Sequence, residues 1–233
     1  MNARIDPEIY TAEKTESARD KTIHKFLNAI SSYNCEEASK MKKVKMGVKP
    51  LIYPVPVILL GANVDGKPNY NTLGNFGSMS ISPVSFFIYV SSAKRNYTNK
   101  GILQNQSFSV NIPSVELVEA TDYCGIVSGW KADKSEIFES FYGKLATAPM
   151  IMECPVNLEC KLAKNFDVHP CEVFVGEVVE TYVGEQYITE GDRHKLPDIG
   201  KINPIILSAD NKYWKIGESF AKAYSIGKGY RKK

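Results

Sequence analysis

The sequence predicts a mainly β fold, a barrel with a few short helices and an N-terminal helical extension. From residue 51 onward, short runs of β-branched and aromatic residues recur and are separated by turn residues. Between Val156 and Leu162, apolar and polar side chains alternate, which is the pattern of a half-buried strand. The helices expected in this part of the chain are short and span residues 98–104 and 115–123. Many strands with few helices favour a barrel over a doubly wound sheet.

The first forty residues are expected to form a separate helical leader. Ile23, Phe26, Leu27 and Ile30 follow the spacing of a helix with one apolar stripe. Such a stripe fits a helix that packs on the main domain or on a second subunit better than a partner-binding helix. We therefore expect two parts, a leader at residues 1–40 and one domain at residues 41–233.

The main domain is expected to open with a strand at residues 55–60 and a turn at residues 65–68. Residues 69–80, rich in small and amide side chains, lie between this strand and the next. Later strands are expected at residues 86–90, 108–112, 156–162 and 173–182.

Composition and charge narrow the class of protein. Hydrophobic residues make up 43% and charged residues 24% of the 233 residues, as in folded soluble domains. The apolar stretch at residues 51–62 contains two prolines and is too short to span a bilayer, so no membrane segment is expected. A net charge of +3 does not require a nucleic-acid partner. A barrel that binds nucleic acid through the lysines of residues 42–49 and 228–233 is disfavoured, because no strand carries the aromatic residues of an RNA-binding sheet.

The five cysteines indicate a reducing compartment rather than a disulfide framework. Their number is odd and no secretory signal precedes them, so we expect a cytoplasmic protein. Cys154, Cys160, His169 and Cys171 are close in sequence but lack the close pairs typical of zinc sites. The alternation at residues 156–162 also places Cys160 among apolar side chains, where a thiol packs as a small hydrophobic group. No metal site is therefore expected.

Two segments are suited to a phosphorylated aromatic ligand. Residues 74–80 are rich in glycine and serine, so their backbone can approach a flat ring closely. Residues 91–98 open a helix and bring Arg95 and the Thr98 hydroxyl to its N-terminus, which favours a phosphate. The alternative is a glycine-rich turn and an ordinary helix cap with a solvated arginine, and the motifs alone do not decide between the two.

The order of the motifs resembles one family. The segments at residues 53–62, 65–69, 95–98, 108–113, 121–129 and 153–160 follow one another as in flavin reductase-like, flavoredoxin-type proteins. The resemblance covers residues 41–182 and implies a split β-barrel, usually a homodimer, with FMN bound near the subunit interface. It also implies an NAD(P)H-dependent flavin reductase, with hydride transfer between transient NADH or NADPH and flavin. The alternative function is a flavoredoxin-type electron carrier, with FMN as a fixed prosthetic group that serves a redox protein partner.

The resemblance assigns cofactor contacts to positions of this chain. The expected contacts of the flavin ring are Asn69, Thr72, Ser78, Met79 and Ser80. The expected contacts of the ribityl chain and the phosphate are Ser91, Ser92, Ala93, Arg95 and Thr98. Either Lys131 or Lys134 would lie near the flavin. No catalytic residue is assigned, because FMN and the nicotinamide carry the chemistry themselves.

Some positions depart from the family or stay open. Many relatives have a tryptophan where Asn75 stands and a cysteine where Ser80 stands, which leaves ring stacking and redox potential undetermined. Cys124 fits the family and is interpreted as a packing residue, because it has no C-x-x-C partner. The aromatic tail at residues 214–230 is expected to close the barrel edge as a helix or strand, or alternatively to cover a neighbouring subunit's flavin.

Overall fold

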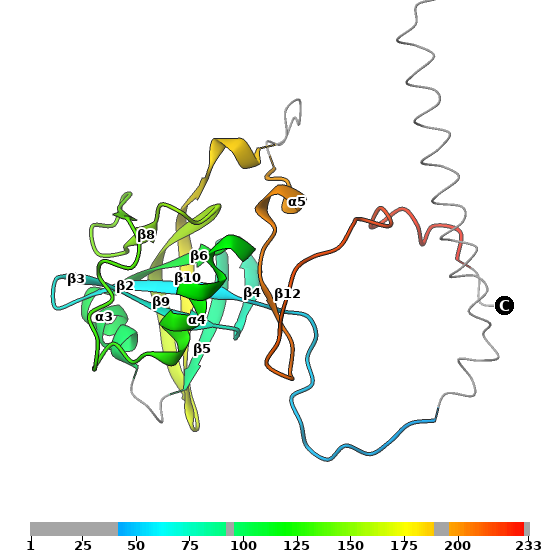
Figure 1. The fold of residues 1–233 in the computed structure, drawn as a ribbon, viewed down its shortest axis with the longest axis horizontal. Coiled ribbons are helices and arrows are strands. Elements are labelled where there is room, and N and C mark those ends of the chain that lie inside the picture. Colours follow the sequence, from blue (N-terminus) through cyan, green and yellow to red (C-terminus); the bar gives the residue numbers. More distant parts are fainter. Residues whose placement is uncertain (1–41, 92–95, 189–195, 231–233) are drawn as a thin grey trace, which may run out of the picture. The chain divides into compact units, whose positions relative to one another are not determined.

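A computed structural model describes residues 42–91, 96–188 and 196–230 of the chain. The predicted leader helix and the whole of its segment, residues 1–40, lie outside these residues. Residues Pro50–Glu218 form one compact unit, built on a sheet of seven antiparallel strands (Figure 1). In spatial order the strands are β3 (Lys67–Leu73), β2 (Ile58–Val64), β6 (Ser107–Ile112), β9 (Val156–Val168), β10 (Cys171–Val183), β5 (Val84–Ser91) and β4 (Phe76–Ile81).

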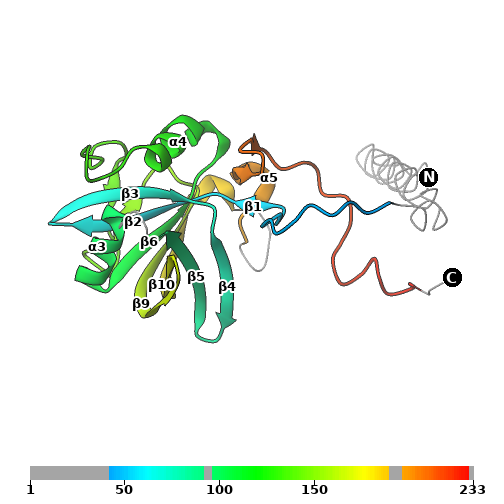
Figure 2. The same ribbon diagram turned by 90° about the horizontal axis from the view of Figure 1, so that it is seen from below.

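The two edge strands of this sheet follow each other in the sequence. Only Gly74 and Asn75 separate β3 from β4, and these two strands pair with β2 and β5, not with each other. The sheet curls so that the two edges diverge from this corner (Figure 2). The predicted barrel is therefore confirmed as a split one. Residues 69–80, expected only as a segment between strands, belong mostly to β3 and β4.

The inner face of the sheet forms the main hydrophobic core. Its fully buried side chains include Ile58, Leu60, Ile88, Phe108 and Phe174. A side chain at Gly176 would place its Cβ only 2.4 Å from the Phe108 ring, so glycine is required where this ring crosses β10. Cys160 is fully buried in the same core, as the alternation of its strand predicts.

The turn between β2 and β3 contains only two residues. Val64 pairs with Lys67, so Asp65 and Gly66 alone make the connection, with φ of 51° and 84°. Positive φ at both positions is the requirement of a type I′ hairpin, which an Asp-Gly pair satisfies. The turn predicted at this site is confirmed.

Two helices lie against the β2–β3 end of the sheet. They are α3 (Tyr97–Asn105), which packs on β2, and α4 (Val118–Ile126), which packs on β3 after the short helix η2 (Val115–Leu117). Both were predicted within a few residues. Gly101 lets α3 approach β2, because a Cβ there would lie 2.3 Å from the carbonyl oxygen of Asn63.

Short elements complete the unit. The strand predicted at residues 55–60 is divided at Val57. Its first part, β1 (Val55–Pro56), belongs to a second, three-stranded sheet. That sheet also contains β11 (Ile206–Leu207) and β12 (Tyr213–Trp214). Of the tail at residues 214–230, only Trp214 belongs to a strand, and this strand is not at the edge of the main sheet. The remaining elements are β7 (Ser140–Phe141), β8 (Met150–Ile151), η3 (Glu185–Tyr187) and α5 (Ile199–Ile202).

The polar face of β9 corrects one sequence expectation. Alternation predicts that residues 157 and 159 face solvent, but Asn157 is 4% exposed and Glu159 is fully buried. The Glu159 carboxylate accepts hydrogen bonds from the backbone N–H groups of Lys144 at 3.0 Å and Leu145 at 2.5 Å. The second face of β9 is therefore covered by residues 140–151, which pack over it.

The second compact unit contains, among the described residues, 42–49 and 219–230. The lysine-containing segment 42–49 is exposed, and residues 223–229 form successive turns with exposed Tyr224. None of the helices in the described parts of the chain is long and apolar enough to cross a membrane.

Candidate ligand site at the N-terminus of α3

The candidate site is built around the N-terminus of α3, whose preceding residues 92–95 lie outside the described part of the chain. No described side chain caps it, and its first turn contains no acidic residue. The N–H of Asn99 bonds back to the carbonyl of Asn96 at 3.0 Å, whereas no acceptor among the described residues takes the N–H groups of Tyr97 and Thr98. Free N–H groups at the positive end of a helix dipole attract an anion.

Two polar side chains are fixed beside this helix end. Asn69 on β3 is 3% exposed and donates its Nδ2–H to the Oγ1 of Thr98 at 2.7 Å. A hydroxyl has one donor and two acceptor positions, so Thr98 keeps its own proton for another acceptor. The pair thus presents an oriented O–H donor next to the free N–H groups.

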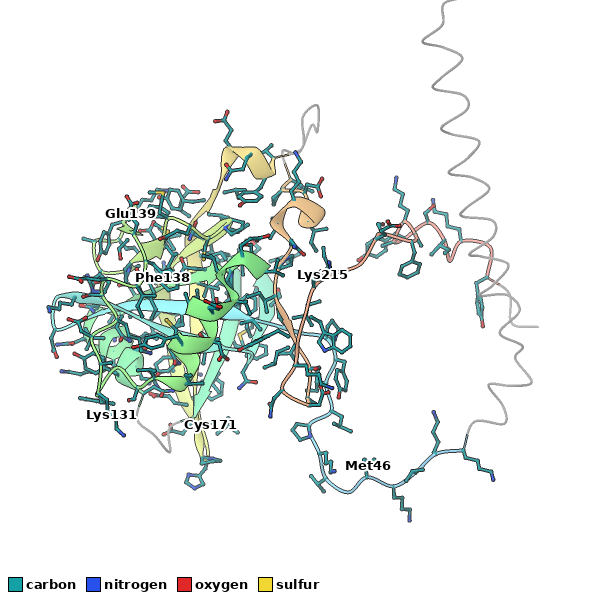
Figure 3. The ribbon with its side chains drawn as sticks, in the orientation of Figure 1. Met46, Lys131, Phe138, Glu139, Cys171 and Lys215 are labelled. Carbon is teal, nitrogen blue, oxygen red and sulfur yellow. The ribbon has the colours of Figure 1, made fainter. Side chains whose placement is uncertain are left out.

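Lys134 is a buried cation near the same place. Its side chain leaves the segment after α4, is 2% exposed, and donates from Nζ to the carbonyl oxygens of Tyr70 and Cys124, both at 2.9 Å. Burial lowers the pKa of the Lys134 ammonium from its ordinary value. Lys131, by contrast, is exposed and points away from the body of the protein (Figure 3).

These groups surround two adjoining pockets. The smaller, of about 100 Å³, lies between the start of α3, residues 125–129, Asn71 and Lys134. The larger, of about 450 Å³, extends over the β2–β3 turn and shares Tyr97, Gly129 and Lys134 with the first. Gly129 is needed for this arrangement, because a Cβ there would lie 2.6 Å from the Oδ1 of Asn69 and 2.8 Å from the Tyr97 ring.

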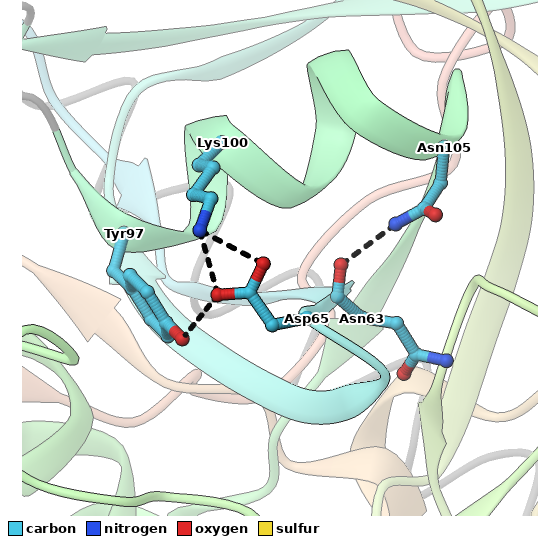
Figure 4. Close-up of polar contacts among 5 residues, drawn as sticks. All are labelled: Asn63, Asp65, Tyr97, Lys100 and Asn105. Carbon is cyan, nitrogen blue, oxygen red and sulfur yellow. Dashed lines mark hydrogen bonds and ion pairs between the residues drawn. The ribbon is translucent and has the colours of Figure 1, made fainter.

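Several charged residues at the rim are already paired. Lys100 bonds both carboxylate oxygens of Asp65, at 2.8 and 2.6 Å, and the Tyr97 hydroxyl donates to the same carboxylate at 3.4 Å (Figure 4). Lys67 bonds Asp133 at 2.9 Å, and this contact holds the pKa of the Asp133 carboxyl well below its usual range. The other charged residues in the described lining of the larger pocket are the buried Lys134 and the exposed Lys131.

The structure gathers some of the expected cofactor contacts and separates others. Asn69, Thr98 and Lys134 converge on the α3 N-terminus. Thr72 lies on the opposite face of β3, where its hydroxyl donates to the carbonyl of Thr121 in α4. Ser78, Met79 and Ser80 lie on the edge strand β4, and Ser91 ends β5 opposite Cys171. Ser92, Ala93 and Arg95 lie outside the described residues.

Sequence reasoning missed several residues of these pockets. Asn71 follows Asn69 on the same face of β3, and the strand period of two was the signal that could have identified it. Asn96 and Gly129 carry no comparable signal, because their role depends on which elements meet at the pocket.

The cysteines do not form a reactive or metal-binding group among the described residues. Cys124 is fully buried, and burial raises the pKa of its thiol to about 11, which agrees with a packing role. No cluster of three or more His, Cys, Asp or Glu side chains suited to a metal occurs in the parts of the chain that the structure describes.

Comparisons with known proteins find relatives along most of the chain. A family model described as "Flavin reductase like domain" matches residues 51–196. An uncharacterized protein of Archaeoglobus fulgidus is 30% identical over 166 residues, which are 68% of this chain and 86% of that protein. A flavoredoxin from Methanosarcina acetivorans is 45% identical with a TM-score of 0.75, over 81% of this chain and 98% of its own. A flavoredoxin of Desulfovibrio vulgaris (Miyazaki F) is 34% identical with a TM-score of 0.73, over 81% and 100%.

Proposed function

Because the chain belongs to the flavin reductase like family, we propose that it binds FMN and transfers a hydride between a nicotinamide nucleotide and flavin. The observation that carries the proposal is the uncapped N-terminus of α3 with the Asn69–Thr98 pair beside it. FMN-binding and flavoredoxin proteins among the structural relatives support the choice of flavin. The proposal includes the homodimer, the transient NADH or NADPH and the cytoplasmic location expected from the sequence.

The residues present fit a flavin phosphate. Free N–H groups at the start of α3 and the unused Thr98 proton are hydrogen-bond donors, as a phosphate requires. The Lys134 ammonium, with two of its three N–H groups used, keeps one donor and a positive charge at the shared wall of the pockets. Arg95, which the resemblance assigns to the phosphate, would add a second cation.

When bound, FMN supplies reversible uptake of a hydride. Thr98 and the α3 backbone would hold the phosphate, and Asn69 orients Thr98 through its 2.7 Å hydrogen bond. Lys134 would stabilise negative charge at the site, since a buried ammonium is screened little by solvent. Gly129 keeps residues 125–129 close enough to Asn69 and Tyr97 to shape the pocket.

Binding of FMN and riboflavin by two matched variants tests the proposal. Thr98→Val removes the hydroxyl and should weaken FMN roughly tenfold or more, with a smaller effect on riboflavin, which has no phosphate. Thr98→Ser keeps the hydroxyl and should bind both nearly as the wild type does. Arg95→Ala is expected to show the same selective loss of FMN. A purified chain that stays colourless and leaves added FMN fully fluorescent would refute flavin binding.

The second candidate function is an electron carrier that keeps FMN as a fixed group and serves a redox protein partner. The two flavoredoxins among the relatives favour it. Steady-state oxidation of NADH and NADPH with excess free flavin separates the two functions. Turnover supports the reductase, and a bound flavin that neither nucleotide reduces supports the carrier.

A further inference from the structure

A third and larger pocket lies on the other side of α3, between this helix and the hairpin of β9 and β10. It has a volume of about 840 Å³, within the range of small-molecule sites. Its described lining combines α3 residues, Trp130 and the residues around Cys171, which begins β10 (Figure 3). Asn96 lines both this pocket and the small one at the α3 N-terminus, so the two are neighbours.

This pocket contains a buried acceptor that no described group satisfies. Asn99 is 5% exposed, and its Nδ2 donates to the Oε2 of Glu172 at 3.1 Å. The other Glu172 oxygen accepts from Asn165 at 3.3 Å, which holds the carboxylate in place. Because the amide nitrogen must face this carboxylate, the Asn99 Oδ1 faces elsewhere, and it has no hydrogen-bond partner in the described structure. A buried, unsatisfied oxygen calls for an N–H or O–H donor from a ligand.

The charge of the lining is negative. Glu172 and Asp167 are direct cross-strand partners on β10 and β9, and both line the pocket. Lys100, the lysine of the described lining, is already paired with Asp65, and the lining also contains His169. Like charges placed opposite each other repel, and a ligand that donates hydrogen bonds to them relieves this repulsion. A phosphate at the same place would increase it.

Trp130 and Leu103 add a surface for a flat ring. Trp130 is 56% exposed and contacts Tyr97 edge-to-face at 4.8 Å between ring centroids, which limits its orientation. The Lys100 ammonium lies over the Trp130 ring, 5.9 Å from its centroid. The pocket therefore offers an aromatic side chain and acceptors for amine and hydroxyl groups, and the lysine of its described lining is paired. These features match an adenosine group whose ribose carries free hydroxyls.

We propose that this pocket binds the adenosine half of NADH and discriminates against NADPH, through Asn99 as an acceptor and through Glu172 and Asp167 as acceptors that repel a 2′-phosphate. The inference rests on the proposed function, because it specifies which nicotinamide nucleotide is the reductant. With the adenosine half held there, the nicotinamide half of the dinucleotide would extend toward the flavin site past Asn96, which both pockets share.

Two probes without redox chemistry test the pocket directly. Isothermal titration of the FMN-loaded full chain uses 5′-AMP, which resembles the adenosine half of NADH, and 2′,5′-ADP, which resembles that of NADPH. We expect 5′-AMP to bind at least roughly tenfold more tightly than 2′,5′-ADP, as expected for a repelled phosphate. Equal binding of the two probes, tighter binding of 2′,5′-ADP, or no binding of either would overturn the inference.

Variants assign the effect to the pocket. Asn99→Ala should weaken 5′-AMP roughly fivefold to tenfold, because one hydrogen bond is lost. Glu172→Gln should reduce the discrimination between the probes to about threefold or less, and it carries the test alone if Asn99→Ala does not fold. Glu177→Gln, on the same strand but in contact with Lys161 outside the pocket, is the control and should change neither affinity. Unchanged discrimination in Glu172→Gln would contradict the assignment.

The outcomes also separate this inference from the proposed function. A chain that retains no FMN refutes flavin binding, while the effects of Asn99→Ala and Glu172→Gln on 5′-AMP still report on this pocket. Release of FMN by 5′-AMP would show that the nucleotide enters the flavin site instead, and would overturn the inference alone.

Discussion

Replacing Lys134 by methionine should destabilise the folded protein although no ion pair is lost. Its ammonium is 2% exposed and donates to two main-chain carbonyls, of Tyr70 in β3 and Cys124 in α4, at 2.9 Å each. A hydrogen bond from a charged group contributes about 1.5 to 3 kcal/mol, and the variant leaves both carbonyls without this donor. Release of the buried charge offsets part of the loss, so we expect the free energy of unfolding to fall by about 2 to 4 kcal/mol.

Urea denaturation at neutral pH, with the m-value compared between proteins, measures this effect. Lys131→Met is the matched control, because Lys131 lines the 450 Å³ pocket as Lys134 does, but its side chain is exposed. It should change stability by no more than about 0.5 kcal/mol. Equal effects of the two substitutions would refute the argument that Lys134 ties β3 to α4.

The pH dependence of the unfolding free energy, compared between wild type and Lys134→Met, tests the role of Lys134 a second time. Its pKa is lowered in the folded state, so between that lowered value and the ordinary 10.5 the unfolded chain binds more protons than the folded one. Stability rises with pH wherever the unfolded state binds more protons. The stability advantage of wild type over Lys134→Met should therefore grow as the pH is raised toward 10.5.

Two further predictions concern other buried groups. Burial raises the pKa of the Cys124 thiol from 9.0 to about 11, so the contribution of the protonated thiol to stability is complete below pH 9 and is lost as the pH rises toward 11. Unfolding free energies measured across this range should therefore fall less steeply for Cys124→Ala than for wild type. Parallel curves for the two proteins would contradict this. Glu159→Gln should cost about 1 to 3 kcal/mol in thermal or urea unfolding, because an amide group replaces one of the carboxylate oxygens that accept two backbone N–H groups. Glu180→Gln mainly removes a surface ion pair with Lys144 and should cost clearly less than Glu159→Gln, so a comparable loss would count against the buried carboxylate.

Local signals in the sequence were sufficient for much of the fold. The Asp65–Gly66 turn is decided by backbone conformations that few residue pairs adopt, and it was predicted at the right residues. The helix at α3 and the strands β6 and β10 were likewise predicted within a few residues. For the two strands, runs of β-branched and aromatic residues were the signal. Elements whose partners lie far away in the sequence were harder. β1 leaves the main sheet for β11, which lies about 150 residues later, and nothing near Val57 indicates this.

The second face of β9 shows why alternation can mislead. Asn157 and Glu159 are polar and were expected in solvent, yet residues 140–151 cover them. This segment supplies a backbone carbonyl that accepts from Asn157 and backbone N–H groups that donate to Glu159. A strand that alternates apolar and polar residues is half-buried only if no other segment packs on its polar face. That depends on a long-range segment whose own sequence carries no strong periodic pattern.

The candidate site was predictable in its chemistry but not in its geometry. Thr98 was identified because a hydroxyl at a helix N-terminus suits a phosphate wherever the helix lies. Asn69 and Thr72 were grouped as contacts of one ring, although an odd separation of three along a strand puts them on opposite faces of β3. The period of the strand alone would have separated them.

The two candidate lysines differ by a property that no motif contains. Lys131 and Lys134 are identical in chemistry and three residues apart, but only Lys134 meets two inward-facing carbonyls from different elements. Those carbonyls offset part of the cost of burying its charge, although burial still lowers the pKa of the ammonium. The buried charge is screened little by solvent and can therefore act on a nearby ligand. The same contacts therefore stabilise the fold and prepare the site. This coupling is why we expect Lys134→Met to lower both stability and FMN affinity, whereas Lys131→Met should change neither.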